Sequence, residues 1–312
     1  MIKHFIYLDP QKMYSLSSQI FEGVTEFIVS ENENESEDSE TQKGPVGSGK
    51  VLADVIKSSN KSTEKRFLHD YSYTIFESHL IDKSMVLEYS IPYGDTDEFK
   101  KSIEKYSFIK VKARAIFNDI NKITELFNEF NSIGEAITTI TYQEQIEKLR
   151  LELESLKSST GDRNEKVRLE QEFKRLSNIS KLSKENGLYQ DPKFMEKLSL
   201  LTKYGFSDQF EIHQYAGELL FTSCLKREFL REKEDILIKK YSRKTEREIV
   251  VLGVISQAFS TYKPEVEGDK EINNLKSVLL NIVEHLSNME NSISGKQNNE
   301  IVIDPIAAYF EL

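Results

Sequence analysis

Four apolar residues in the middle of the chain are spaced three, four and three positions apart: Ile146, Leu149, Leu153 and Leu156. This spacing puts the side chains on one side of an α-helix, whereas in a strand alternate residues share a face. Glu and Lys fill the other positions, and a similar spacing returns between 169 and 180, after the Gly-containing segment SSTGDRN. The sequence therefore predicts an antiparallel helical hairpin at 141–185, with the seam of a coiled coil, projecting from the body of the protein.

Two roles are open for this hairpin. In the first, the two apolar seams pack against each other and the hairpin is an architectural arm. In the second, the hairpin is a dimerisation or partner-docking arm, because short heptad seams commonly associate with another helix. The four seam residues are the interaction candidates for the second role.

Strand-like segments lie on both sides of the predicted hairpin. SFIKVKARAIF (107–117) alternates with a period of two, which is typical of a half-buried strand. FEIHQYAGELLFTSCL (210–225) is rich in strand-forming residues, and EIVVLGVISQAF (248–259) has the strongest strand pattern in the chain. The final segment EIVIDPIAAYFEL (300–312) predicts a strand that breaks at Pro305, followed by a docked tail.

Helical patterns accompany these strands. The short strand-like run FIYLD is followed by Pro10, which suits the first turn of a helix capped by Asp9. A second helix, from residue 63, is expected to pack through a face that includes Tyr71, Ile75 and Ile81. A third segment near the C-terminus has one broad apolar helical face, formed by Leu275, Val278, Leu279, Ile282, Val283, Leu286 and Met289.

These patterns predict an α+β fold, with small mixed sheets packed with helices and the projecting helical hairpin. We expect an N-terminal α+β domain at 1–140, the hairpin at 141–185 and a C-terminal α+β domain at 186–312. The N-terminal domain includes a disordered acidic loop at about 30–62, because residues 31–40 hold six acidic side chains and no apolar one.

That loop contains GPVGSGKV (44–51), which nearly matches the phosphate-binding loop G-x-x-x-x-G-K-[ST]. A functional loop of this kind follows a buried strand and places a hydroxyl after its Lys to reach Mg²⁺. Here the preceding residues SEDSETQK are acidic and polar, and Val51 follows Lys50. The sequence therefore argues against an ATPase.

Composition and short motifs argue against further classes of function. The formal net charge is −10, which opposes attraction of the whole molecule to nucleic acid or anionic lipid. Cys224 is the only cysteine and lies in the apolar run LLFTSCL, so we expect a buried, inert thiol. The five histidines lack metal-ligand spacing and no G-x-S-x-G occurs, so we assign no catalytic, cofactor-binding or metal-binding residues.

The N-terminal sequence MIKHFIYLDP lacks the apolar stretch of a secretory signal, and no segment approaches the length needed to cross a bilayer. Together with the single cysteine, this predicts a cytoplasmic protein that does not bind membranes.

Three segments carry a family resemblance: FIYLDPQKMYSLSSQIFEG, RFLHDYSYTIFESHL with SFIKVKARAIFNDI, and IVIDPIAAYFEL. They resemble a domain-of-unknown-function family of uncharacterised bacterial cytoplasmic proteins, linked to anti-phage or mobile-element gene neighbourhoods. The resemblance implies no catalytic residues. It draws attention to Asp9, Tyr14, Ser15 and Gln19 as interaction candidates, against the alternative that they cap and pack the first helix.

We therefore expect a non-enzymatic interaction or regulatory protein of the bacterial cytoplasm, whose hairpin binds a protein partner or a second copy. One alternative is an enzyme or nucleotide sensor with a site assembled from the strand-end carboxylates Asp9, Asp119 and Asp304. A weaker alternative is nucleic-acid binding through residues 226–247, which hold nine Lys or Arg against five Asp or Glu.

Overall fold

The computed structural model describes residues 2–20, 62–90, 96–157, 163–259 and 275–312. By its internal contacts the chain divides into two compact units. Unit 1 consists of residues 1–118, 210–269 and 296–312, and unit 2 consists of residues 119–209 and 270–295. The acidic loop expected at about 30–62, including GPVGSGKV, lies outside the described residues except for its last position.

Unit 1 contains one mixed sheet, so the α+β class is confirmed. The strands described are β1 (Lys3–Leu8), β2 (Val86–Ser90), β3 (Phe108–Asp119), β4 (Phe210–Ala216), β5 (Leu219–Leu225), β6 (Lys244–Gln257) and β7 (Glu300–Glu311). Their pairings close into a ring in the order β3, β4, β5, β7, β6 and back to β3. Strand β1 adds to β7 in antiparallel orientation, and β2 adds to β3 in parallel orientation.

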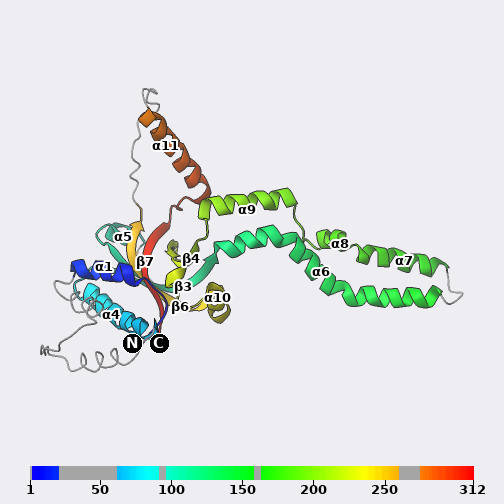
Figure 1. Cartoon of the computed structure of the whole chain (residues 1–312), viewed down its shortest axis with the longest axis horizontal. Helices are drawn as coiled ribbons and strands as arrows, with labels where there is room; N and C mark the ends of the chain where they lie inside the picture. Colours follow the sequence, from blue (N-terminus) through cyan, green and yellow to red (C-terminus); the bar gives the residue numbers. More distant parts are fainter. Residues whose placement is uncertain (1, 21–61, 91–95, 158–162, 260–274) are drawn as a thin grey trace. The chain divides into compact units, whose positions relative to one another are not determined.

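The two faces of this sheet build separate cores. On β6, Ile249 and Val251 belong to one core, while Val250 and Leu252 belong to the other, as the period of two requires. All five ring strands contribute to the first core, together with helices α5 (Thr96–Ile103) and α10 (Glu234–Tyr241). Helices α1 (Pro10–Ile20) and α4 (Ser62–Asp82) cover the second core and pack beside each other (Figure 1).

Strand β7 continues through Pro305, so the predicted break there is wrong. Proline cannot donate to a ladder, and the pairing of β7 with β6 shifts register between Leu252 and Gly253, opposite Pro305. A Cβ on Gly253 would lie 2.5 Å from the carbonyl oxygen of Asp304 and 2.9 Å from Cα of Pro305. The glycine thus allows a close approach of the two strands, and the strand absorbs the proline at a bulge.

Two predictions of which side chains are buried are also wrong. Helix α4 buries Tyr73, Phe76 and Leu80, whereas Tyr71 and Ile75 are exposed. Cys224 is exposed on β5 between the buried residues Ser223 and Leu225. Thr222, on the same face of the strand as Cys224, is buried, so the cover of this face ends before Cys224, near the end of the strand.

Unit 2 is helical in the residues described. Its helices are α6 (Ile120–Lys157), α7 (Arg163–Ser177), α8 (Ile179–Glu185), α9 (Pro192–Phe206) and α11 (Leu275–Ser294). Helices α7, α8 and α9 each pack on α6 and follow one another along it, and α11 packs on α9 (Figure 1). The long helix α6 extends through 120–140 as well as the first arm of the hairpin expected at 141–185. Residues 119–140 group with unit 2 by their contacts.

Close backbone contacts hold the returning segment on α6. The side chain of Asn131 accepts a hydrogen bond from the backbone N–H of Gln190 at 2.8 Å and donates one to its carbonyl oxygen at 3.0 Å. One turn along, a Cβ on Gly134 would lie 1.9 Å from the carbonyl oxygen of Leu188. Gly134 therefore sets how closely the segment after α8 approaches α6.

Candidate functional site

The first candidate site surrounds Asp9, at the junction of β1 and α1. Its carboxylate is fully buried, and Oδ1 accepts a hydrogen bond from the backbone N–H of Lys12 at 2.9 Å. This is the contact of an N-cap residue, which satisfies a donor that the first helical turn leaves free. The backbone N–H of Asp9 donates to the carbonyl oxygen of Ile306 at 2.8 Å, so β7 fixes the position of the cap.

Two lysines and a second carboxylate complete a cluster at this cap. Oδ2 of Asp9 accepts from Nζ of Lys226 at 3.2 Å and lies 3.7 Å from Nζ of Lys12. The same Lys12 ammonium contacts the carboxylate of Asp304 and donates to the carbonyl oxygen of Pro305 at 2.9 Å. Asp9 and Asp304 therefore share one cation, and the charges of the two carboxylates are balanced by two lysines.

The cluster also affects Tyr7. Burial, and then the negative charges of Asp9 and Asp304, raise the pKa of the Tyr7 hydroxyl well above its ordinary value. Tyr7 is therefore a neutral phenol at physiological pH. Asp119, the third carboxylate of the predicted assembled site, is buried at the end of β3 and belongs to unit 2. Within unit 1 the structure thus brings together Asp9 and Asp304.

The other candidates on α1 have local roles. The hydroxyl oxygen of Tyr14 lies 2.6 Å from Nδ1 of His69 on α4, which joins the two helices. Burial raises the pKa of Tyr14, and a hydrogen bond with Ser72 partly offsets this. Ser15 and Gln19 are exposed, and the carbonyl oxygen of Ser15 accepts from the Gln19 side chain at 3.1 Å.

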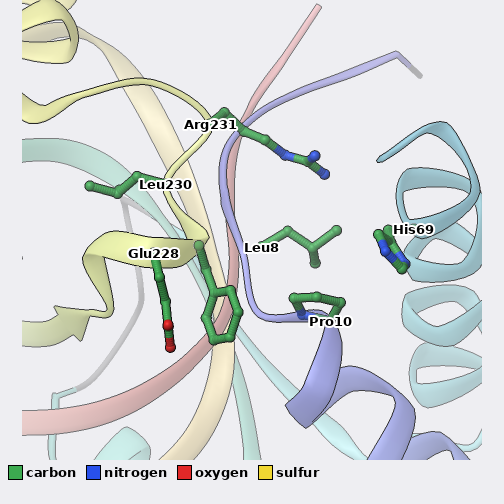
Figure 2. Close-up of a pocket in the computed structure, with 7 residues that line it drawn as sticks. Leu8, Pro10, His69, Glu228, Leu230 and Arg231 are labelled. Carbon is green, nitrogen blue, oxygen red and sulfur yellow. The ribbon is translucent and has the colours of Figure 1, made fainter. Parts of the chain in front are cut away.

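A small pocket of about 160 Å³ lies next to this cluster. Figure 2 shows Leu8 and Pro10 between the segment 228–231 and the His69 ring on α4. Arg231 is the one arginine among the residues that line the pocket, and its guanidinium forms an ion pair with Asp70. The pocket is smaller than the 300 Å³ or more that small-molecule sites commonly have.

The basic segment 226–247 is divided among several elements. It contains a 3₁₀ turn at Arg227–Phe229, helix α10 and the first residues of β6. Several of its cations pair with carboxylates: Lys226 with Asp9, Arg227 with Glu234 at 2.5 Å, Arg231 with Asp70, and Lys240 with Glu232 at 2.6 Å. These pairs reduce the positive potential that nucleic-acid binding would need.

A second ion cluster was missed by the sequence analysis. The side chain of Glu77 on α4 is 4% exposed, and its carboxylate accepts a hydrogen bond from the hydroxyl of Tyr309 at 2.5 Å. The carboxylate also lies 3.1 Å from Nζ of Lys110 and forms an ion pair with Lys3. Burial alone would raise the pKa of Glu77, but the hydrogen bonds from Lys3 and Tyr309 and the charge of Lys110 lower it. A signal existed, because Glu77 lies four residues after Tyr73 and three before Leu80, within the buried face of α4.

The predicted hairpin residues face the inside of unit 2. Leu153 is buried and Ile146, Leu149 and Leu156 are half-buried, and both α7 and α8 pack on α6. On α7, Leu169 and Leu176 are buried in turn. Both seams therefore contain buried residues, and the two helices pack on each other.

Other apolar residues of unit 2 are exposed. On α6 they form a stripe at Leu126, Ile133, Ile137 and Ile140, with exposed fractions of 39% to 75%. Further exposed apolar residues are Leu151 and Val167 on α6 and α7, Phe194, Leu200, Leu201 and Tyr204 on α9, and Leu275, Leu279, Leu280, Ile282, Val283, Leu286 and Met289 on α11. Large exposed apolar surfaces are typical of sites that bind another protein.

The described residues include no helix with the length and apolar character needed to cross a membrane. They also include no group of three or more His, Cys, Asp or Glu side chains placed to hold a metal ion.

The fold and the site define an α+β protein with a ring of paired strands, an ion cluster at the first helix cap and a helical unit with exposed apolar faces. Residues 2–309 match the model of a family described as a domain of unknown function, DUF6414. The chain therefore belongs to this family. None of the curated proteins and none of the solved structures matches it.

Proposed function

We propose that this chain is a non-enzymatic interaction protein that acts by binding another protein chain through the helices of unit 2. The observation that carries the proposal is the distribution of exposed large apolar side chains. Among the described residues, ten lie on α6, α7 and α9 and seven on α11, against seven in unit 1. The setting that we propose, from the family resemblance of the sequence, is the cytoplasm of a bacterium.

The apolar stripe on α6, which precedes the hairpin expected at 141–185, is the part of this helix best suited to a partner. Ile133, Ile137 and Ile140 are spaced four and three residues apart, which aligns them along one side of the helix. A helix presenting such a stripe binds a partner by laying it into an apolar groove or against another helix. By contrast, Leu153 is buried and Ile146, Leu149 and Leu156 are half-buried within unit 2.

The alternative of an enzyme site built from strand-end carboxylates has less support. Asp9 and Asp304 already share the Lys12 ammonium, and Asp9 also accepts a hydrogen bond from the N–H of Lys12 as a helix cap. A carboxylate in these contacts has a structural explanation that needs no substrate.

Site-specific photo-crosslinking in the native host tests the proposal. A photoreactive amino acid replaces Ile137 in the apolar stripe or, as the control, the exposed Glu144 on the same helix. We expect discrete protein adducts from position 137 and none from 144, and we expect the adducts to disappear when Ile133 and Ile140 are both changed to Lys. Circular dichroism checks that every variant keeps its helix content. If folded protein gives no adducts from position 137 or from exposed positions on α9 and α11, the proposed function is wrong.

A further inference from the structure

Helix α11 exposes an apolar seam with a regular heptad spacing. Leu275, Leu279, Ile282, Leu286 and Met289 are spaced four, three, four and three residues apart. This is the spacing of the a and d positions of a coiled coil. Their exposed fractions run from 42% to 73%, so the seam is largely uncovered in the single chain.

The attachment of α11 to the rest of unit 2 leaves this seam available. Near its C-terminal end, α11 packs on α9, where a Cβ on Gly205 would lie 2.6 Å from Cγ2 of Ile293. Ile293 is half-buried, whereas Leu279, Ile282 and Leu286 are exposed. The packing on α9 therefore fixes one end of the helix, while the seam before that end faces solvent.

The exposed apolar surface of α11 is large enough for a specific contact. The five seam side chains are 42% to 73% accessible, which corresponds to roughly 450 Å². A standard protein–protein interface covers about 800 Å² on each partner. Pairing along this seam would therefore supply about half of an interface of ordinary size.

The charges beside the seam select a second copy of the same helix. When two α11 helices run antiparallel around a midpoint at Glu284, Leu279 faces Met289 of the other copy and Ile282 faces Leu286. The same arrangement puts Lys276 of each copy beside Glu290 of the other copy, on one flank of the seam. The contact therefore occurs twice, once at each end of the paired helices. The other flank, at 278, 285 and 292, carries no Lys, Arg, Asp or Glu.

A parallel pair lacks this match. In register, Lys276 of one helix and Glu290 of the other are 14 residues apart, or about 21 Å along the helix axis. Only the antiparallel pair makes two opposite-charge contacts from one Lys and one Glu. It also has the two-fold symmetry of most homodimers, in which the same patch serves on both subunits.

We propose that α11 is a homodimerisation helix, which pairs antiparallel with α11 of a second copy of this chain through Leu279, Ile282, Leu286 and Met289. This inference rests on the proposed function, because it names one partner for the same helical unit. The α6 stripe is left free for a different protein.

Sedimentation equilibrium of the full chain tests the seam. We expect a reversible dimer whose dissociation constant rises at least tenfold when Leu279 and Leu286 are both changed to Lys. The matched control changes Ser287 and Asn288 to Lys, which adds the same charge at exposed positions off the seam and is expected to alter the dissociation constant less than twofold. Circular dichroism compares the helix content of both variants with that of the unchanged protein.

A charge exchange tests the orientation. Lys276→Glu and Glu290→Lys each turn both attractive pairs into repulsive ones, so each should weaken the dimer about tenfold. The double variant restores opposite charges and should return the dissociation constant to within about threefold of the original. In a parallel pair the two changes would act independently, so failure of the double variant to recover would overturn the antiparallel arrangement.

Other outcomes separate this inference from the proposed function. A protein that stays monomeric at about 100 µM, or a dimer that survives the Leu279 and Leu286 changes, would overturn the assignment of α11. Adducts from position 137 on α6 would in that case still support the proposed function. If those adducts and the dimer were both absent, the two proposals would fail together.

Discussion

Replacing Glu77 by Gln should destabilise unit 1 strongly, although the substitution keeps the shape of the side chain. Glu77 is the counter-ion of two lysines that are themselves mostly buried, since Lys3 is 12% and Lys110 is 17% exposed. Removing one partner of a fully buried ion pair costs about 3–5 kcal/mol, because the remaining charge stays away from water. The two ammonium groups here keep some contact with solvent, so we expect a loss of about 2–3 kcal/mol at pH 7.

The effect of Glu77 should also depend on pH in a defined direction. Its pKa in the folded protein is lowered from the ordinary value of 4.5, so the unfolded chain takes up the proton first as the pH falls. The stability that the ionised carboxylate contributes is therefore complete above about pH 4.5 and decreases as the pH falls through the folded pKa. The difference between the unchanged protein and Glu77→Gln should shrink over that range.

Urea unfolding followed by far-UV circular dichroism measures both effects, since the chain has no tryptophan. Hydrogen exchange of peptides from β1, α4 and β7 then locates the loss. The control is Glu88→Gln, which removes a carboxylate that is 59% exposed and lies 3.8 Å from the same Lys110. It should cost less than about 0.5 kcal/mol. If the two variants were equally stable at pH 7, or if the cost of Glu77→Gln were the same at pH 7 and pH 3, the account of this cluster would be wrong.

Three glycines give further predictions. Gly253→Ala should cost about 1–3 kcal/mol in urea unfolding, because the new Cβ meets the backbone of Asp304 and Pro305, which has little freedom to move. Gly217→Ala, where φ is +63° and no atom crowds the Cβ, should cost only about 1 kcal/mol of backbone strain, and an equal cost at both sites would contradict the close-approach argument. Gly134→Ala should separate the segment near Leu188 from α6. Hydrogen exchange should then become faster in α6 and α9 and stay unchanged in the sheet. If exchange in α6 and α9 did not change, the contact at Gly134 would not be what holds this segment on α6.

Elements with strong local patterns were predictable from the sequence. The period of two in 107–117 matches β3, the strand-forming run at 248–259 matches β6, and the amphipathic pattern after residue 275 matches α11. These patterns arise from the geometry of the element itself and therefore need no knowledge of the partners. The position of Asp9 before Pro10 likewise identified the cap of α1.

Features that depend on distant segments were not predictable. Pro305 is tolerated within β7 because Gly253, more than fifty residues earlier, permits a bulge opposite it. Asp9 pairs with Lys226, and Lys12 links Asp9 to Asp304. Both Lys226 and Asp304 lie far from Asp9 in the sequence. The apolar face of α11 was visible in the sequence, but a single chain's pattern does not say whether such a face is covered by its own fold or by another molecule.

The ring of paired strands has a consequence for the order in which the protein folds during synthesis. Strand β7, made after the other strands described, pairs with β1, made before them, and also with β5 and β6. Until residues 300–311 have left the ribosome, β1 lacks its ladder partner and the ring is open between β5 and β6. Because such long-range pairings form slowly, the nascent chain must keep β1 and the open edges of β5 and β6 from aggregating until β7 has been made.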